Sequence, residues 1–154
     1  MSTPDQIARD ILIDAPVDVV WRVVTEPEHI ARWFSDTAEI DLRPGGDGVL
    51  TFRQNGGHVA PLVVDTVRPP TTFAFRWSAP EGETAHEGNS TLVTFSLAPE
   101  GDGATRLSVV ESGIAALPGG DERHRAFFDD HSQGWGTIVP RLGEYAPTAA
   151  GALR

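Results

Sequence analysis

The sequence contains no cysteine and no lysine, and these two absences narrow the chemistry that it can perform. Without cysteine, the chain has no disulfide, no thiolate nucleophile and no sulfur ligand for a metal ion. Without lysine, no side-chain amine is available for Schiff-base chemistry. Covalent catalysis through sulfur or through a lysine amine is therefore excluded.

Positive charge is also scarce. The chain carries 12 basic residues, all of them Arg, against 22 acidic residues, and its formal net charge is −10. A surface of this sign repels phosphate backbones, so we expect no nucleic-acid partner. No apolar run approaches the roughly 20 residues of a membrane span, and the N-terminus lacks the layout of a signal peptide. We therefore expect a cytoplasmic protein that does not bind a membrane.

The length of 154 residues is typical of one domain. No internal repeat or linker divides the chain, so we expect a single domain over residues 1–154 with its core over about 7–146. The segment 147–154 is composed of small and polar residues and is expected to fray.

Alternation of apolar and polar residues predicts about seven strands. Strong turn signals separate several of them, among them Arg43-Pro44-Gly45-Gly46 and Asn55-Gly56-Gly57. Because most connections are short, we expect an antiparallel meander. The expected strands cover residues 7–13, 38–42, 49–53, 59–67, 73–77, 91–97 and 106–111.

Three helices complete the pattern. Pro16 and Pro27 each suit the first position of a short helix, because the N–H that proline lacks would be unpaired there. A longer helix of some twenty residues is expected to begin near Asp121, with an apolar stripe that includes Trp135. Pro140 falls inside it and is expected to kink it. The whole pattern predicts an α+β domain.

This order of elements resembles the helix-grip fold of the START-like (SRPBCC) superfamily. Several short sequence motifs are similar to those of the polyketide cyclase families and of the homologues of the activator of heat-shock-protein ATPase. These motifs are Ile13-Asp14-Ala15-Pro16 followed by Val20-Trp21, Trp33-Phe34, Arg43-Pro44-Gly45-Gly46, Pro69-Pro70 before Trp77, Thr105-Arg106-Leu107 leading to Glu111-Ser112-Gly113, and Gly134-Trp135. The resemblance covers residues 7–146 and implies a curved antiparallel sheet around the long helix, with an apolar cavity between them.

Two polar residues fall on apolar faces, where burial is costly unless a partner compensates it. Glu111 continues the face of Leu107 and Val109, so it would point into the cavity as a hydrogen-bonding group or as an acid or base with a raised pKa. Alternatively, Glu111 lies in water at the strand end or pairs with an Arg. His131 lies one turn before Trp135 and could transfer a proton, or it is a satisfied core or rim histidine.

Aromatic residues from three separated segments are expected to face the same interior, as in small-molecule pockets. The indole N–H groups of Trp77 and Trp135 need partners, which favours a polar cavity edge. Plain core packing is the alternative, and we prefer it for Phe73 and Trp21. The expected ligand-binding residues are Trp33, Phe34, Phe75, Trp77, Glu111, Phe128, His131 and Trp135.

The sequence offers no signature of a cofactor or metal. Its five His residues show no HExxH motif and no tight ligand spacing. Residues 45–48 lack the Lys of a phosphate-binding loop, and no GxSxG elbow is present. We therefore expect no metal, no cofactor and no covalent hydrolysis.

Three functions remain open. The first is a module that binds a small hydrophobic or aromatic molecule, and because nothing in the sequence demands catalysis, this is the leading hypothesis. The second is a cyclase or dehydratase in which Glu111 or His131 acts as acid or base. The third, implied by the resemblance, is a co-chaperone-like interaction domain with a role in the stress response. The resemblance is also compatible with a homodimer.

Overall fold

The structure is a computed structural model that describes residues 3–53 and 57–152. The predicted α+β class is confirmed, with helices and strands in the predicted order. The elements are β1 (Gln6–Ile13), α1 (Val17–Thr25), α2 (Pro27–Trp33), β2 (Thr37–Ile40), β3 (Asp47–Phe52), β4 (His58–Arg68), β5 (Thr72–Trp77), β6 (Thr91–Glu100), β7 (Ala104–Ser112), the 3₁₀ helix η2 (Ile114–Ala116) and α3 (Asp121–Ala152). The predicted turn residues Asn55 and Gly56 lie outside the described residues.

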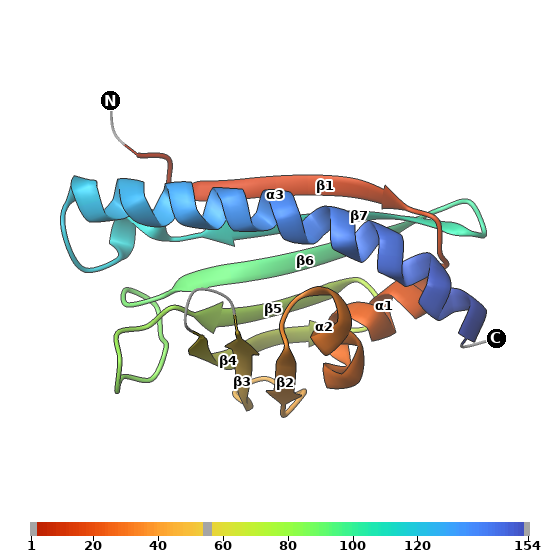
Figure 1. Ribbon diagram of the computed structural model, residues 1–154, viewed down its shortest axis with the longest axis horizontal. Helices are drawn as coiled ribbons and strands as arrows, with labels where there is room; N and C mark the ends of the chain where they lie inside the picture. Colours follow the sequence, from red (N-terminus) through yellow and green to blue (C-terminus); the bar gives the residue numbers. More distant parts are fainter. Residues whose placement is uncertain (1–2, 54–56, 153–154) are drawn as a thin grey trace.

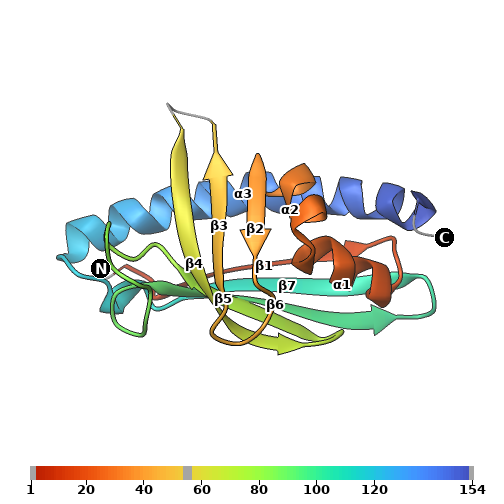
Figure 2. The ribbon, with the colours of Figure 1, turned by 90° about the horizontal axis from the view of Figure 1, so that it is seen from below.

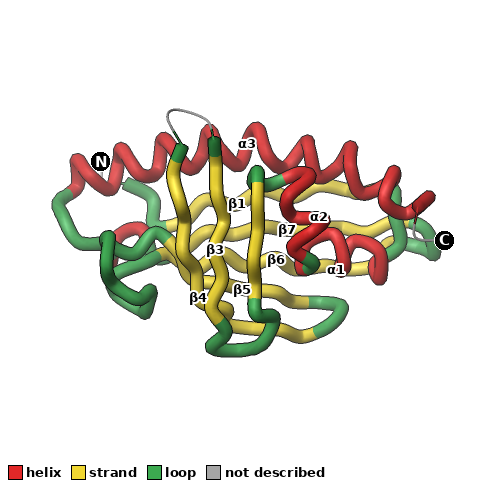
Figure 3. The backbone as a smooth tube through the Cα atoms, turned by 60° about the horizontal axis from the view of Figure 1, so that its bottom comes forward, coloured by secondary structure: helices red, strands yellow, loops and turns green. Residues whose placement is uncertain are grey.

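The strands within the described residues form one antiparallel sheet in the order β1-β7-β6-β5-β4-β3-β2. Figures 2 and 3 show that the sheet is strongly curved, with β2, β3 and β4 running across the direction of β1 and β7. The pairing of β4 with β5 shifts between Val64 and Thr66, and such a bulge bends a strand and increases its twist. The curvature gives the sheet a concave face that encloses the core.

The long helix α3 lies along this sheet for most of the length of the molecule, as Figure 1 shows. It has 32 residues, where the sequence predicted some twenty, and Pro140 lies inside one continuous helix. The predicted fraying of residues 147–152 is wrong: this segment is helical, with Ala149 and Ala150 buried. None of the described helices has both the length and the apolar composition that a bilayer span requires.

The two short helices fix the position of Trp33. In α1 the carbonyl of Val23 would ordinarily accept a hydrogen bond from the N–H four residues later, but that residue is Pro27, which has none. The indole Nε1 of Trp33 donates to this carbonyl instead, at 2.9 Å. The bond ties the end of α2 back to α1 and holds Trp33 and its neighbour Phe34 against the core, where both are buried.

Candidate functional site

A groove opens between α2, β3 and α3, which is the region where the helix-grip resemblance implies a cavity. Its volume is about 420 Å³, within the usual range for small-molecule sites. The lining residues come from three separate parts of the chain. They are Ala31, Arg32, Trp33, Phe34, Ser35, Asp36, Phe52, Asp130, Gln133, Gly134, Thr137, Ile138 and Arg141.

One wall of this groove is aromatic. The ring of Phe34 lies at the centre of the aromatic packing, with centroid distances of 5.2 Å to Trp33, 5.9 Å to Phe52 and 5.4 Å to Trp135. These distances are typical of favourable ring pairs, so the wall is rigid and pre-formed.

The facing wall belongs to α3 and is polar. Asp130, Gln133 and Arg141 project from this helix, and Gly134 leaves a gap among them. A Cβ built on Gly134 would meet no other atom within 4 Å. The groove thus combines aromatic surface with hydrogen-bonding and charged groups of both signs, and it is more polar than the apolar cavity that the sequence predicted.

Next to this groove, the carboxylate of Glu111 is completely buried and fully hydrogen-bonded. Oε2 accepts from the Trp77 indole at 2.8 Å and from the Thr91 hydroxyl at 2.6 Å. Oε1 accepts from His131 Nδ1 and from the Trp135 indole, both at 2.8 Å. The four donors come from β5, β6 and α3, so a single side chain of β7 links the sheet to the long helix.

This environment determines the charge of Glu111. Burial by itself raises the pKa of the carboxyl, but the hydrogen bond and positive charge of His131, together with the bonds from Thr91 and Trp135, outweigh it. The net result is a pKa below the ordinary value. Glu111 is therefore an ionised acceptor without a free lone pair to offer a ligand, which differs from the raised pKa considered for a cavity acid.

The Glu111 carboxylate in turn orients His131. Because an ionised carboxylate can only accept, Nδ1 of His131 carries the proton in this bond. The imidazole stacks on Phe127 with centroids 3.8 Å apart and meets Trp77 edge-on at 5.7 Å. The side chain keeps 18% of its surface exposed, so the ring lies at the rim of the core with Nε2 as its remaining polar atom.

The structure divides the eight residues of the predicted ligand-binding set. Trp33 and Phe34 line the groove, whereas Trp77, Glu111, His131 and Trp135 share the buried network. Phe75 packs edge-on against Trp77 at 5.4 Å. Phe128 is partly buried against the core.

Three residues near the site are absent from the predicted ligand-binding set, although the sequence placed either Phe127 or Phe128 on the apolar stripe of the long helix. Phe127, not Phe128, stacks on His131, and the four-residue spacing between them was the available signal. Phe52 and Arg141 line the groove from β3 and α3, two elements that the curved sheet brings together. Their sequence positions alone carry no such signal.

Among the residues that the structure describes, a cluster of metal-ligating side chains occurs at the junction of α1 and α2. Donor atoms of Glu26, Glu28 and His29 lie within 4.8 Å of one another. However, Glu26 is paired with Arg22 at 2.7 Å, and His29 Nδ1 is hydrogen-bonded to the Tyr145 hydroxyl at 2.7 Å. Because the guanidinium of Arg22 already occupies the place of a cation, an ion-pair network explains this cluster.

The solved structures that are similar to this chain include CalU16 and DynU16. CalU16 from Micromonospora echinospora is 28% identical with a TM-score of 0.62, covering 91% of this chain and 73% of its own. DynU16, from the dynemicin biosynthetic locus, is 26% identical with a TM-score of 0.72, covering 94% of this chain and 48% of its own. Both share the architecture described above.

A third solved structure, the HSP90 activator PFC0360w from Plasmodium falciparum, shows the same fold at 15% identity. Its TM-score is 0.69, and the match covers 90% of this chain and 94% of that one. No curated protein matches this chain. The family described as "Activator of Hsp90 ATPase homolog 1-like protein" matches residues 14–146, which is most of the sequence. The chain therefore belongs to this family, in agreement with the resemblance that its motifs carry.

Proposed function

We propose that this protein binds a small aromatic molecule with polar substituents in the groove between α2, β3 and α3. The observation that carries the proposal is the groove itself, in which Trp33, Phe34 and Phe52 face the polar side chains of α3. Small-molecule sites combine apolar and aromatic walls with polar groups that set orientation, and this groove contains both kinds, with the polar side chains in the majority. The ligand would be met in the cytoplasm, as the sequence predicts.

The charges of the groove refine the ligand class. Arg32 and Arg141 can donate to carbonyl, phenolate or carboxylate oxygens, and Asp36 and Asp130 can accept from hydroxyl groups. Asp36 is partly engaged, since its Oδ2 accepts from the backbone N–H of Arg53 at 2.7 Å. A planar aromatic ring carrying hydroxyl or carbonyl groups matches both walls better than a plain hydrocarbon, such as a fatty-acid chain.

A thermal-shift screen tests the proposal. The wild-type protein is melted with hydroxylated polyketides, flavonoids, sterols and fatty acids. A ligand that binds only the folded state at a hundredfold excess over its Kd adds about 2.7 kcal/mol, which raises the Tm of a domain of this size by several degrees. We expect aromatic compounds with polar groups to give the largest shifts.

Two glycines of α3 provide a matched pair of variants. Gly134→Leu places a side chain in the groove, whereas Gly136→Leu places the same side chain on the exposed face two residues away. A Cβ at either position has open space, and leucine has the higher helix propensity, so both variants are expected to fold. Gly134→Leu should weaken the binding of the best ligand at least tenfold, and Gly136→Leu should leave it unchanged.

Two outcomes would contradict the proposal. The first is the absence of a shift with any compound while the protein melts cooperatively, which would favour the co-chaperone-like interaction domain instead. The second is a ligand whose Kd is the same in wild type and Gly134→Leu, because it would then bind elsewhere. The enzymatic alternative has less support, since His131 is not among the residues that line the groove.

A further inference from the structure

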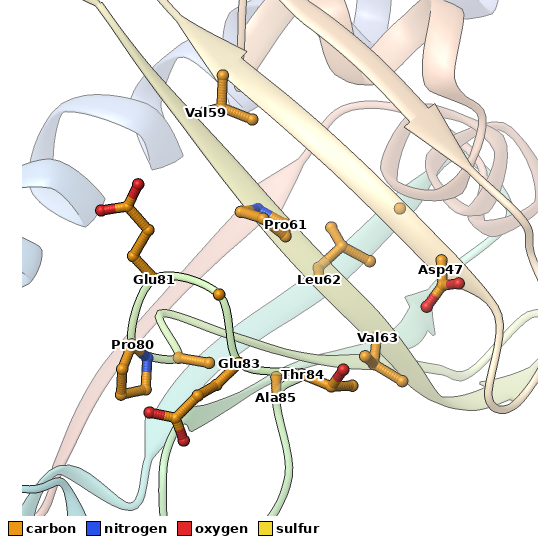
Figure 4. A pocket seen from close by; sticks show the side chains of 13 residues that line it. Asp47, Val59, Pro61, Leu62, Val63, Pro80, Glu81, Glu83, Thr84 and Ala85 are labelled. Atoms are coloured by element: carbon orange, nitrogen blue, oxygen red, sulfur yellow. The ribbon is translucent and has the colours of Figure 1, made fainter.

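A second hollow lies on the opposite, outer face of the sheet, between β4 and the loop of residues 79–85 (Figure 4). We call it the outer hollow, and its volume is about 630 Å³. Its floor is apolar. Val59, Pro61 and Val63 project outward from β4, alternating with Leu62 and Val64, which are buried in the core.

This apolar floor is unusual for an outer sheet face, where polar residues are expected. Val59 keeps 62% of its surface exposed, the largest fraction among the exposed large hydrophobic residues of the described chain. Ala79 and Pro80 extend the apolar surface along the loop. A ligand that covered this floor would gain binding free energy from the apolar surface removed from water.

The charged residues that line the outer hollow are all acidic. They are Asp47, Glu81 and Glu83, and none of them forms an ion pair with another described residue. Figure 4 shows Glu81 and Asp47 on opposite sides of the floor. One cation is adjacent in the strand ladder, because Arg76 pairs with Val63, but Arg76 does not line the hollow.

We propose that the outer hollow binds a small organic cation with an apolar body. The floor would bury the apolar part, and the carboxylate at one side of it, Glu81 or Asp47, would hold the ammonium group by charge-assisted hydrogen bonds. The net charge of −10 adds attraction for a cation and repels an anion of the same shape. The volume suits a small molecule, and this site is separate from the groove between α2, β3 and α3.

The test compares three probes of one shape: 4-phenylbutylamine, which is a cation at neutral pH, the neutral 4-phenylbutanol and the anionic 4-phenylbutanoate. Each is titrated into the full ¹⁵N-labelled chain at low salt, and amide shifts report the Kd and the location. We expect the cation to bind at least ten times more tightly than the alcohol, with shifts concentrated on β4 and residues 79–85. The anion should not bind there.

Two variants of equal charge change complete the test. Asp47→Asn with Glu81→Gln removes two carboxylates of the hollow and should weaken the cation at least fivefold. Asp102→Asn with Glu122→Gln removes two exposed carboxylates elsewhere and should change its Kd less than twofold. The proposal is overturned if the cation and alcohol bind equally, if the shifts map elsewhere, or if both double variants weaken binding alike. Binding of a basic peptide but of no small cation would also overturn it.

Discussion

The Nδ1 atom of His131 donates a hydrogen bond to Oε1 of Glu111 at 2.8 Å, although the two residues lie 20 positions apart on α3 and β7. The same carboxylate accepts from the indoles of Trp77 and Trp135 and from Thr91. No buried side-chain nitrogen or oxygen of the described residues lacks a partner. The charged carboxylate of Glu111 is thus stabilised in the core, because each of its two oxygens accepts two hydrogen bonds.

Replacing Glu111 by Gln tests the stabilising role of this network. The amide has the same shape, but its NH₂ group would face two donors, and two hydrogen bonds would be lost in the core. We expect the free energy of unfolding to fall by about 3 kcal/mol, measured by urea denaturation. The exposed Glu100→Gln, which breaks a surface pair with Arg106, should change it by less than about 1 kcal/mol. Equal losses in the two variants would contradict this role for Glu111.

The same variant gives a prediction for pH dependence. The folded-state pKa of Glu111 is lowered from an ordinary value of 4.5, so its stabilising contribution is complete above that value and is lost as the pH falls through the folded-state pKa. The difference in unfolding free energy between wild type and Glu111→Gln, compared at pH 5.5, 4.5 and 3, should therefore shrink as the pH falls. Urea titrations at these pH values measure it. A difference that grows on acidification would mean that the folded-state pKa is raised.

Trp33→Phe tests the bond that replaces the missing N–H of Pro27. The phenyl ring cannot donate to the carbonyl of Val23, and it leaves a small void in the core. We expect the free energy of unfolding to fall by about 2 kcal/mol. The control is Trp21→Phe, because Trp21 is only partly buried at the edge of the core, and it should lose less than half as much. Thermal melts of both variants decide the comparison.

The C-terminal turns of α3 provide a fourth prediction. Ala149 is 4% exposed, whereas Ala152 in the same turn region is exposed. Ala149→Asp buries a charge with no partner and should lower the free energy of unfolding by at least about 2 kcal/mol. Ala152→Asp makes the same change in solvent, so its effect should stay below about 0.5 kcal/mol. If both variants have the same melting temperature as wild type, this end of α3 does not pack on the core.

The sequence by itself predicted the class, the order of elements and the antiparallel sheet, because periodicity, turn residues and prolines act locally. The alternation of Leu107, Val109 and Glu111 correctly placed Glu111 on the buried face of its strand. The extent of α3 was underestimated, because small residues such as Ala149 carry little pattern and are buried only through contact with the rest of the domain.

The tertiary structure alone decided which polar groups meet. The partners of Glu111 come from β5, β6 and α3, and no spacing in the sequence specifies that two indoles, a hydroxyl and an imidazole converge on one carboxylate. Likewise, the curvature of the sheet brings Phe52 of β3 to the groove beside Arg141 of α3. Local patterns determine elements and their buried faces, whereas a site formed by side chains from several elements depends on long-range packing.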